Sequence, residues 1–195
     1  MNEQPKQRLP LRSLAAIYPG YPFRGKLPVD KDGNAFVVQF RHLVVGEALD
    51  DMGGQTLDRV TLPGRRRPEY LWPGDILFMA RGTRNDAAVV KALPHNTVCT
   101  PNFFHLRLKP EAFSLMPEFL AWQLNHVDAQ RYFAMCSQGS AAPSVTKTQL
   151  GDLPVVVPPI EQQKLMMKLT EAARREQALP VSYTHLRAHE TGRNL

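Results

Sequence analysis

The chain has 195 residues, 43% of them hydrophobic, so it can form one ordinary core and is too short for two domains of typical size. Its net charge of +6 favours a polyanionic partner such as a nucleic acid. Two cysteines, Cys99 and Cys136, are too few for a disulfide framework or a four-cysteine zinc site. Because the sequence also lacks a signal peptide and the ~20 apolar residues of a membrane helix, we expect a cytoplasmic protein without membrane contact.

Short β-strands are predicted through the first half of the chain. The expected strands are rich in β-branched and aromatic residues, and turn signals separate them at short intervals. The turn from Trp72 to Asp75 has Pro73 and Gly74 at positions that suit a type II turn, which directs the next strand. The strands are expected at residues 36–40, 59–62, 76–80, 87–92 and 103–108.

Helical periodicity follows the last of these strands. Residues 117–125 and 128–137 place bulky side chains such as Phe119, Leu124 and Phe133 on one face, so both helices should pack on a sheet. Strands come first and helices later, without the alternation of strand and crossover helix that a doubly wound sheet needs. This order predicts an α+β domain with a mixed or antiparallel sheet and packed helices.

The next segment leads from a strand into a long helix. Residues 155–157 are three valines suited to a buried strand, and Pro158 ends it because proline cannot donate to a ladder. Pro159 suits the first position of a helix, and no proline or glycine follows until after Leu179. Apolar side chains recur there at helical spacing, at Leu165, Met166, Leu169, Ala172 and Ala173. This stripe predicts a helix that either docks on its own domain or pairs with another chain.

The composition changes at Pro180. The residues that follow have neither helical nor strand periodicity, and they resemble the tail produced when sequencing-adaptor DNA is translated. We expect residues 180–195 to be non-native or disordered. Without Arg187, Arg193 and Glu190 the chain still has 22 basic and 17 acidic residues, a net charge of +5, so the charge argument does not depend on the tail.

Four motifs along the chain occur in the order and rough spacing of one known family. They are GYPFRG at residues 20–25, FVVQFRHL at 36–43, GDILFMARG at 74–82, and a C-terminal pattern. The C-terminal pattern consists of Gly139, Ser140, Val145, Lys147 and Leu150, then a strand, then Pro158-Pro159-Ile160-Glu161-Gln162. Over residues 9–179 the sequence therefore resembles the specificity (S) subunits of type I restriction-modification systems.

The resemblance implies a non-catalytic protein that addresses double-stranded DNA. Residues 1–157 would form a DNA target-recognition domain, and residues 158–179 a spacer or dimerisation helix. The expected partners are a methyltransferase (M) subunit, which would bind S-adenosylmethionine, and a restriction (R) subunit, which cuts unmodified DNA in defence against foreign DNA. A single recognition domain implies either a half-size subunit that pairs with a second copy of itself, or part of a two-domain subunit.

Polar and basic loops supply the expected DNA contacts. Arginine can fork onto guanine, and asparagine or glutamine onto adenine, while serine and lysine bind phosphates. Gln39 and Arg41 alternate with apolar neighbours, so they should share one face of a strand. The run from Arg65 to Arg67 is equally well explained as a solvated charge run. The predicted contacts are Arg24, Lys26, Gln39, Arg41, Arg81, Arg84, Asn85, Ser140 and Lys147.

No catalytic motif is found in the sequence. Gly20 to Lys26 matches G-x-x-x-x-G-K of a phosphate-binding loop, but Leu27 stands where a hydroxyl is required and Pro28 opposes the helix that should follow. Cys99 is expected to be a core thiol rather than a metal ligand. Two alternatives remain: the recognition portion of a DNA-acting enzyme of the fused restriction-modification type, or a basic protein-interaction module.

Overall fold

The computed structural model describes residues 8–44, 46–50, 57–63, 67–82, 84–136 and 144–178. The strands are β1 (Arg8–Pro10), β2 (Ala15–Pro19), β3 (Ala35–Val38), β4 (Leu49–Asp50), β5 (Asp58–Val60), β6 (Ile76–Met79), β7 (Ala87–Ala92), β8 (Thr97–Cys99), β9 (Phe103–Leu108) and β10 (Pro154–Val156). The α-helices are α1 (Leu11–Leu14), α2 (Pro117–Asn125), α3 (Val127–Cys136), α4 (Lys147–Asp152) and α5 (Ile160–Ala178), with 3-10 turns η1 (Phe40–His42) and η3 (Pro110–Ala112).

A five-stranded sheet, in the order β2-β9-β6-β7-β4, forms the centre of the fold. β6 is antiparallel to β7 and to β9, and only β4 runs parallel to its neighbour. All four β6 residues are buried, because alternate side chains enter different cores. Ile76 and Phe78 pack in the cluster that contains α2 and α3, whereas Leu77 and Met79 pack in the second cluster, which contains Val38 of β3.

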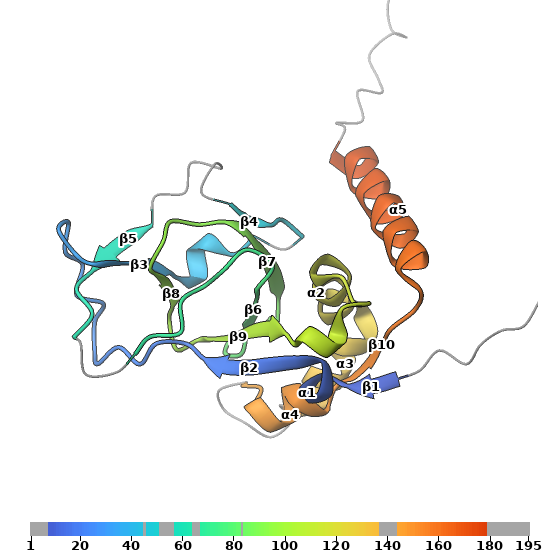
Figure 1. Ribbon diagram of the computed structural model, residues 1–195, viewed down its shortest axis with the longest axis horizontal. Helices are drawn as coiled ribbons and strands as arrows, with labels where there is room; N and C mark the ends of the chain where they lie inside the picture. Colours follow the sequence, from blue (N-terminus) through green and yellow to red (C-terminus); the bar gives the residue numbers. More distant parts are fainter. Residues whose placement is uncertain are drawn as a thin grey trace, which may run out of the picture.

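Two smaller sheets complete the fold. β5, β3 and β8 form a mixed three-stranded sheet, and β1 pairs antiparallel with β10. Figure 1 places the three-stranded sheet at one end of the molecule and α5 at the other, with the five-stranded sheet between them. The predicted α+β class is confirmed, but the predicted single sheet is divided into three.

Element bounds follow the sequence prediction where the apolar pattern is strong. The predicted strands 87–92 and 103–108 and the predicted helix 117–125 coincide with β7, β9 and α2. The predicted strand 36–40 ends early, at Val38, because Gln39 caps the 3-10 turn η1 instead of extending β3. The short elements β1, α1, β2, β4 and α4 were not predicted, since segments of two to six residues carry little periodicity.

A buried glutamine fastens the start of α5 to the body of the domain. The Gln163 side chain is fully buried; its Oε1 accepts from Met116 N at 2.9 Å, and its Nε2 donates to the carbonyls of Ser114 and Pro158 at 2.6 and 2.7 Å. Pro159, predicted at the first helical position, instead precedes the helix, and its carbonyl accepts from Gln163 N. The Pro-Pro-x-x-x-Gln stretch thus positions α5.

We expect Gln163→Ala to lower the free energy of unfolding by about 2–4 kcal/mol, because it leaves a buried N–H and two carbonyls without partners. Gln162→Ala is the matched control, since that side chain is exposed and its removal should change stability by less than about 0.5 kcal/mol. Urea unfolding of the two variants measures the difference. Equal stability of both variants would contradict the anchoring role of Gln163.

Candidate nucleic-acid interface

The loop between β6 and β7 brings Arg81 beside the start of α4. Arg81 forms an isolated antiparallel bridge with Ser144, and Val145 N donates to the Ala80 carbonyl at 2.8 Å. Three residues after Ser144, Lys147 opens α4, whose N-cap Thr146 accepts from Gln149 N. Arg81 and Lys147 are both exposed. Two predicted contacts that lie 66 positions apart in the sequence therefore come from adjacent segments.

The same loop holds Arg84 and Asn85 in different ways. Arg84 Nε lies 3.2 Å from Asp86 Oδ2, and the arginine side chain is 65% exposed. Burial raises the pKa of the Asp86 carboxyl above its ordinary value, and the nearby Arg84 offsets only part of that rise. Asn85 Nδ2 donates to the Met79 carbonyl at 2.9 Å, so one of its two N–H donors stabilises the loop.

A second group of predicted contacts surrounds Asp58 at the start of β5. Asp58 Oδ2 accepts from Gln39 Nε2 and, at 2.7 Å, from Arg41 Nη2. His42 lies beside both, with Nδ1 3.0 Å from Gln39 N and Nε2 3.0 Å from Arg41 Nε. A neutral imidazole has one acceptor nitrogen, so His42 can accept from only one of these donors. Asp58 is thus the partner that the Gln39 and Arg41 side chains share.

The ring of Phe40 joins these two groups. A Cβ on Gly82 would lie 3.2 Å from Phe40 Cε2, so the turn η1 packs against the loop that carries Arg81. Gly82 has φ +127°, a conformation that side-chain-bearing residues rarely adopt. The close contact and the backbone conformation both favour glycine here. The Gln39–Arg41 segment and the Arg81–Asn85 loop are therefore neighbours.

Arg24 and Lys26 lie in the loop between β2 and β3, which packs against the three-stranded sheet. Tyr21 and Phe23 pack in the core of that sheet with ring centroids 5.0 Å apart, and both basic side chains beyond them are exposed. The predicted contact Ser140 lies outside the described residues, as do Arg65 and Arg66.

A buried ionic network lies between the sheets, and the sequence analysis did not identify it. Arg107 donates to both oxygens of Asp75, each at 2.8 Å, and His105 Nε2 lies 2.7 Å from Asp75 Oδ2. Burial alone would raise the pKa of Asp75, but hydrogen bonds from Arg107 and His105 outweigh it and leave this pKa lowered. The sequence held only a weak sign of this network. His105 and Arg107 are polar residues within an otherwise apolar strand, and Asp75 directly precedes another apolar strand.

Metal chemistry gains no support from the cysteines and histidines. Burial raises the pKa of the Cys99 thiol to about 12, as expected for a core residue. Among the described residues no group of three or more histidine, cysteine, aspartate or glutamate side chains could hold a metal ion. Within that same part of the chain, no helix is long and apolar enough to cross a membrane.

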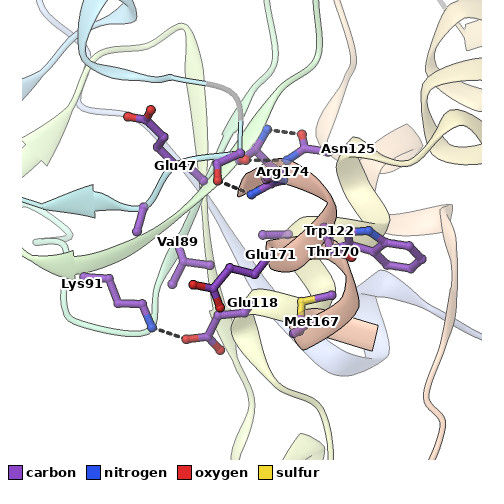
Figure 2. A pocket seen from close by; sticks show the side chains of 15 residues that line it. Glu47, Val89, Lys91, Glu118, Trp122, Asn125, Met167, Thr170, Glu171 and Arg174 are labelled. Atoms are coloured by element: carbon purple, nitrogen blue, oxygen red, sulfur yellow. Dashed lines mark hydrogen bonds and ion pairs between the residues drawn. The ribbon is translucent and has the colours of Figure 1, made fainter. Parts of the chain in front are cut away.

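The pocket shown in Figure 2 lies between α5, α2 and β7. Lys91 of β7 pairs with Glu118 of α2 at one side, and Arg174 of α5 donates to the Gly46 carbonyl at the other. None of the eight predicted DNA contacts that the structure describes lines it. The pocket is therefore separate from the candidate interface.

Comparison with known proteins gives matches only among solved structures. No protein-family model matches the sequence, and no curated protein does. A structure from a type I restriction-modification (R-M) system, solved to explain complex assembly and conformational transition, has a TM-score of 0.62 at 16% identity and covers 91% of this chain. The HsdS subunit from Thermoanaerobacter tengcongensis has a TM-score of 0.58 at 17% identity and covers 92% of this chain. The type I S subunit from M. genitalium has a TM-score of 0.54 at 14% identity and covers 91% of this chain.

The matches agree on one fold. The chain spans 40% of the first matched chain and 42% of each of the other two, so it has the fold of about two fifths of an S subunit. The family resemblance inferred from the motifs is thereby confirmed at the level of fold.

The lowered pKa of Asp75 predicts a specific pH dependence. Its contribution to stability is fully present above the ordinary carboxyl pKa of 3.8 and is lost as the pH falls through the lower pKa of the folded state. We expect Asp75→Asn to lower the free energy of unfolding at pH 7 by about 3 kcal/mol, because Arg107 loses its buried partner. The variant should also lose less stability than the parent on acidification.

Chemical unfolding at a series of pH values measures both effects. Asp32→Asn is the control, because Asp32 is exposed. Stability curves for the parent and Asp75→Asn that remain parallel down to pH 2 would contradict an ionised Asp75.

Proposed function

We propose that the chain is a sequence-specific DNA-binding specificity subunit that directs a type I restriction-modification methyltransferase and endonuclease to a target site. The observation that carries this proposal is the fold likeness to S subunits over more than 90% of the chain. The exposed basic side chains of Arg24, Lys26, Arg81 and Lys147 add to it, since such groups can neutralise DNA phosphates.

In this proposal the chain supplies the address and its partners supply the chemistry. Residues 1–157 form the target-recognition domain, 158–179 the spacer or dimerisation helix, and 180–195 a non-native or disordered tail. The M subunit binds S-adenosylmethionine and flips an adenine out of the duplex for methylation. The R subunit cuts unmodified sites. The chain itself is non-catalytic, carries no cofactor and acts in the cytoplasm.

The outward face of α5 supports pairing with a second recognition domain. Met166 and Met167 pack toward the core, whereas Leu165 and Leu169 are 57% and 62% exposed, one helical turn apart. Apolar side chains at this spacing fit the side of another helix. The second domain belongs either to a second copy of this chain or to the remainder of a longer subunit.

The function can be tested by expressing the chain with its methyltransferase subunit in a host that lacks DNA methylation. Sequencing that detects methylated bases should find one methylated motif across the genome. A palindromic split motif is expected if two identical chains pair. Methylation by the M subunit alone serves as the control. Absence of any motif, with both proteins soluble and associated, would contradict an addressing role for this chain.

We expect Arg81→Ala and Arg84→Ala each to weaken binding to the target duplex by about 1–3 kcal/mol if the arginine reads a base. Lys91→Ala is the matched control, because it also removes one positive charge but lies at the far end of β7. Fluorescence anisotropy with target and scrambled duplexes measures the affinities. Unchanged binding by both arginine variants would contradict base reading by this loop.

A further inference from the structure

One carboxylate holds two of the predicted base-reading side chains. Asp58 lies opposite Val37 in the pairing of β5 with β3, two residues before Gln39. Its Oδ2 accepts from both Gln39 Nε2 and Arg41 Nη2. The contacts join residues 17 and 19 positions apart, so strand pairing sets their geometry.

Both side chains keep hydrogen-bonding capacity beyond their bonds to the carboxylate. The Asp58 side chain is 25% exposed and Arg41 is 58% exposed, so the carboxylate is the more buried partner. A guanidinium has five N–H donors; the bond to Asp58 occupies one and the contact of Nε with His42 Nε2 a second, which leaves three on the two Nη atoms. Gln39 donates from its amide nitrogen to Asp58, and its side chain also accepts from the His42 backbone N–H, so it keeps its second N–H and the second lone pair of its amide oxygen. The group therefore retains donors from Arg41 and an acceptor from Gln39.

The charge of Asp58 affects which part of DNA this group can bind. The carboxylate offsets part of the charge of Arg41 and repels an approaching phosphate. A neutral base edge meets no such repulsion. Burial and the nearby Arg41 also lower the pKa of His42, so no additional positive charge attracts a phosphate here. The group is thus better suited to a base edge than to the DNA backbone.

We propose that Asp58 is a specificity-determining positioning residue, which holds Gln39 and Arg41 toward a purine edge in the major groove and opposes their use as phosphate contacts. This inference rests on the proposed DNA-recognition function. The forked donors of Arg41 match the O6 and N7 acceptors of guanine. Asp58 itself acts through the two side chains and touches no base.

The test is selection from a pool of random duplexes by the full chain bound to its methyltransferase subunit. Asp58→Asn keeps the shape of the side chain and removes its charge. The parent should enrich one motif, and the variant should lose at least about fivefold of its preference at one or two base pairs of that motif. Its binding to unrelated DNA should become tighter and more dependent on salt.

Asp30→Asn is the matched control. Asp30 lies in the loop before β3 and accepts from Thr61 Oγ1 at 2.5 Å, so its replacement removes the same charge next to the same sheet. The control should keep the motif of the parent. A shift of the motif by Asp30→Asn equal to that of Asp58→Asn would overturn the proposal, because loss of charge alone would then explain both.

A double-mutant cycle separates positioning from a purely structural role. If Asp58 acts through its two partners, Asp58→Asn should not change the base preference further in a Gln39→Ala/Arg41→Ala background. A further loss of preference in that background would overturn the inference. A parent that enriches a motif, with an Asp58→Asn variant of unchanged preference, would overturn this inference alone. A parent that enriches no motif would overturn the proposed function as well.

Discussion

The buried Asp75 carboxylate is the contact on which the centre of the five-stranded sheet depends. It accepts from Arg107 and His105 of β9 and from the Trp72 backbone at the turn before β6. The same arginine reaches the carbonyl of Tyr70. One ionised group therefore fixes the turn, the entry into β6 and the pairing of β6 with β9. Because β6 is only four residues long, this also fixes where Arg81 emerges.

Two arginines of the candidate interface lie beside carboxylates, which reduce the positive charge of this surface. Arg41 faces Asp58 and Arg84 faces Asp86, so both predicted base readers are already partly neutralised. Arg24 and Lys26 are exposed in the loop between β2 and β3 without an ion pair to any described residue. Under the proposed function, the unpaired cations would attract DNA over a long range and the paired arginines would discriminate between bases at short range.

The sequence predicted the elements that carry strong patterns and missed what depends on long-range contacts. β7, β9 and α2 were bounded correctly because their apolar side chains repeat regularly along the chain. The division into three sheets was not predictable, since it depends on which strands pair. That Asn85 contacts DNA stays a prediction, and the sequence did not show that one of its N–H groups closes the loop onto the Met79 carbonyl. Residue type alone cannot distinguish a free amide from one that closes its own loop.

The pairing of β1 with β10 has a consequence for how such domains combine. Arg8 lies opposite Val156, and α5 begins four residues later at Ile160, so the chain enters and leaves the fold at one place. Folding units with adjacent ends can be inserted into, or removed from, a longer polypeptide with little disturbance to either part. The whole domain can therefore be exchanged by recombination at this junction without rebuilding α5.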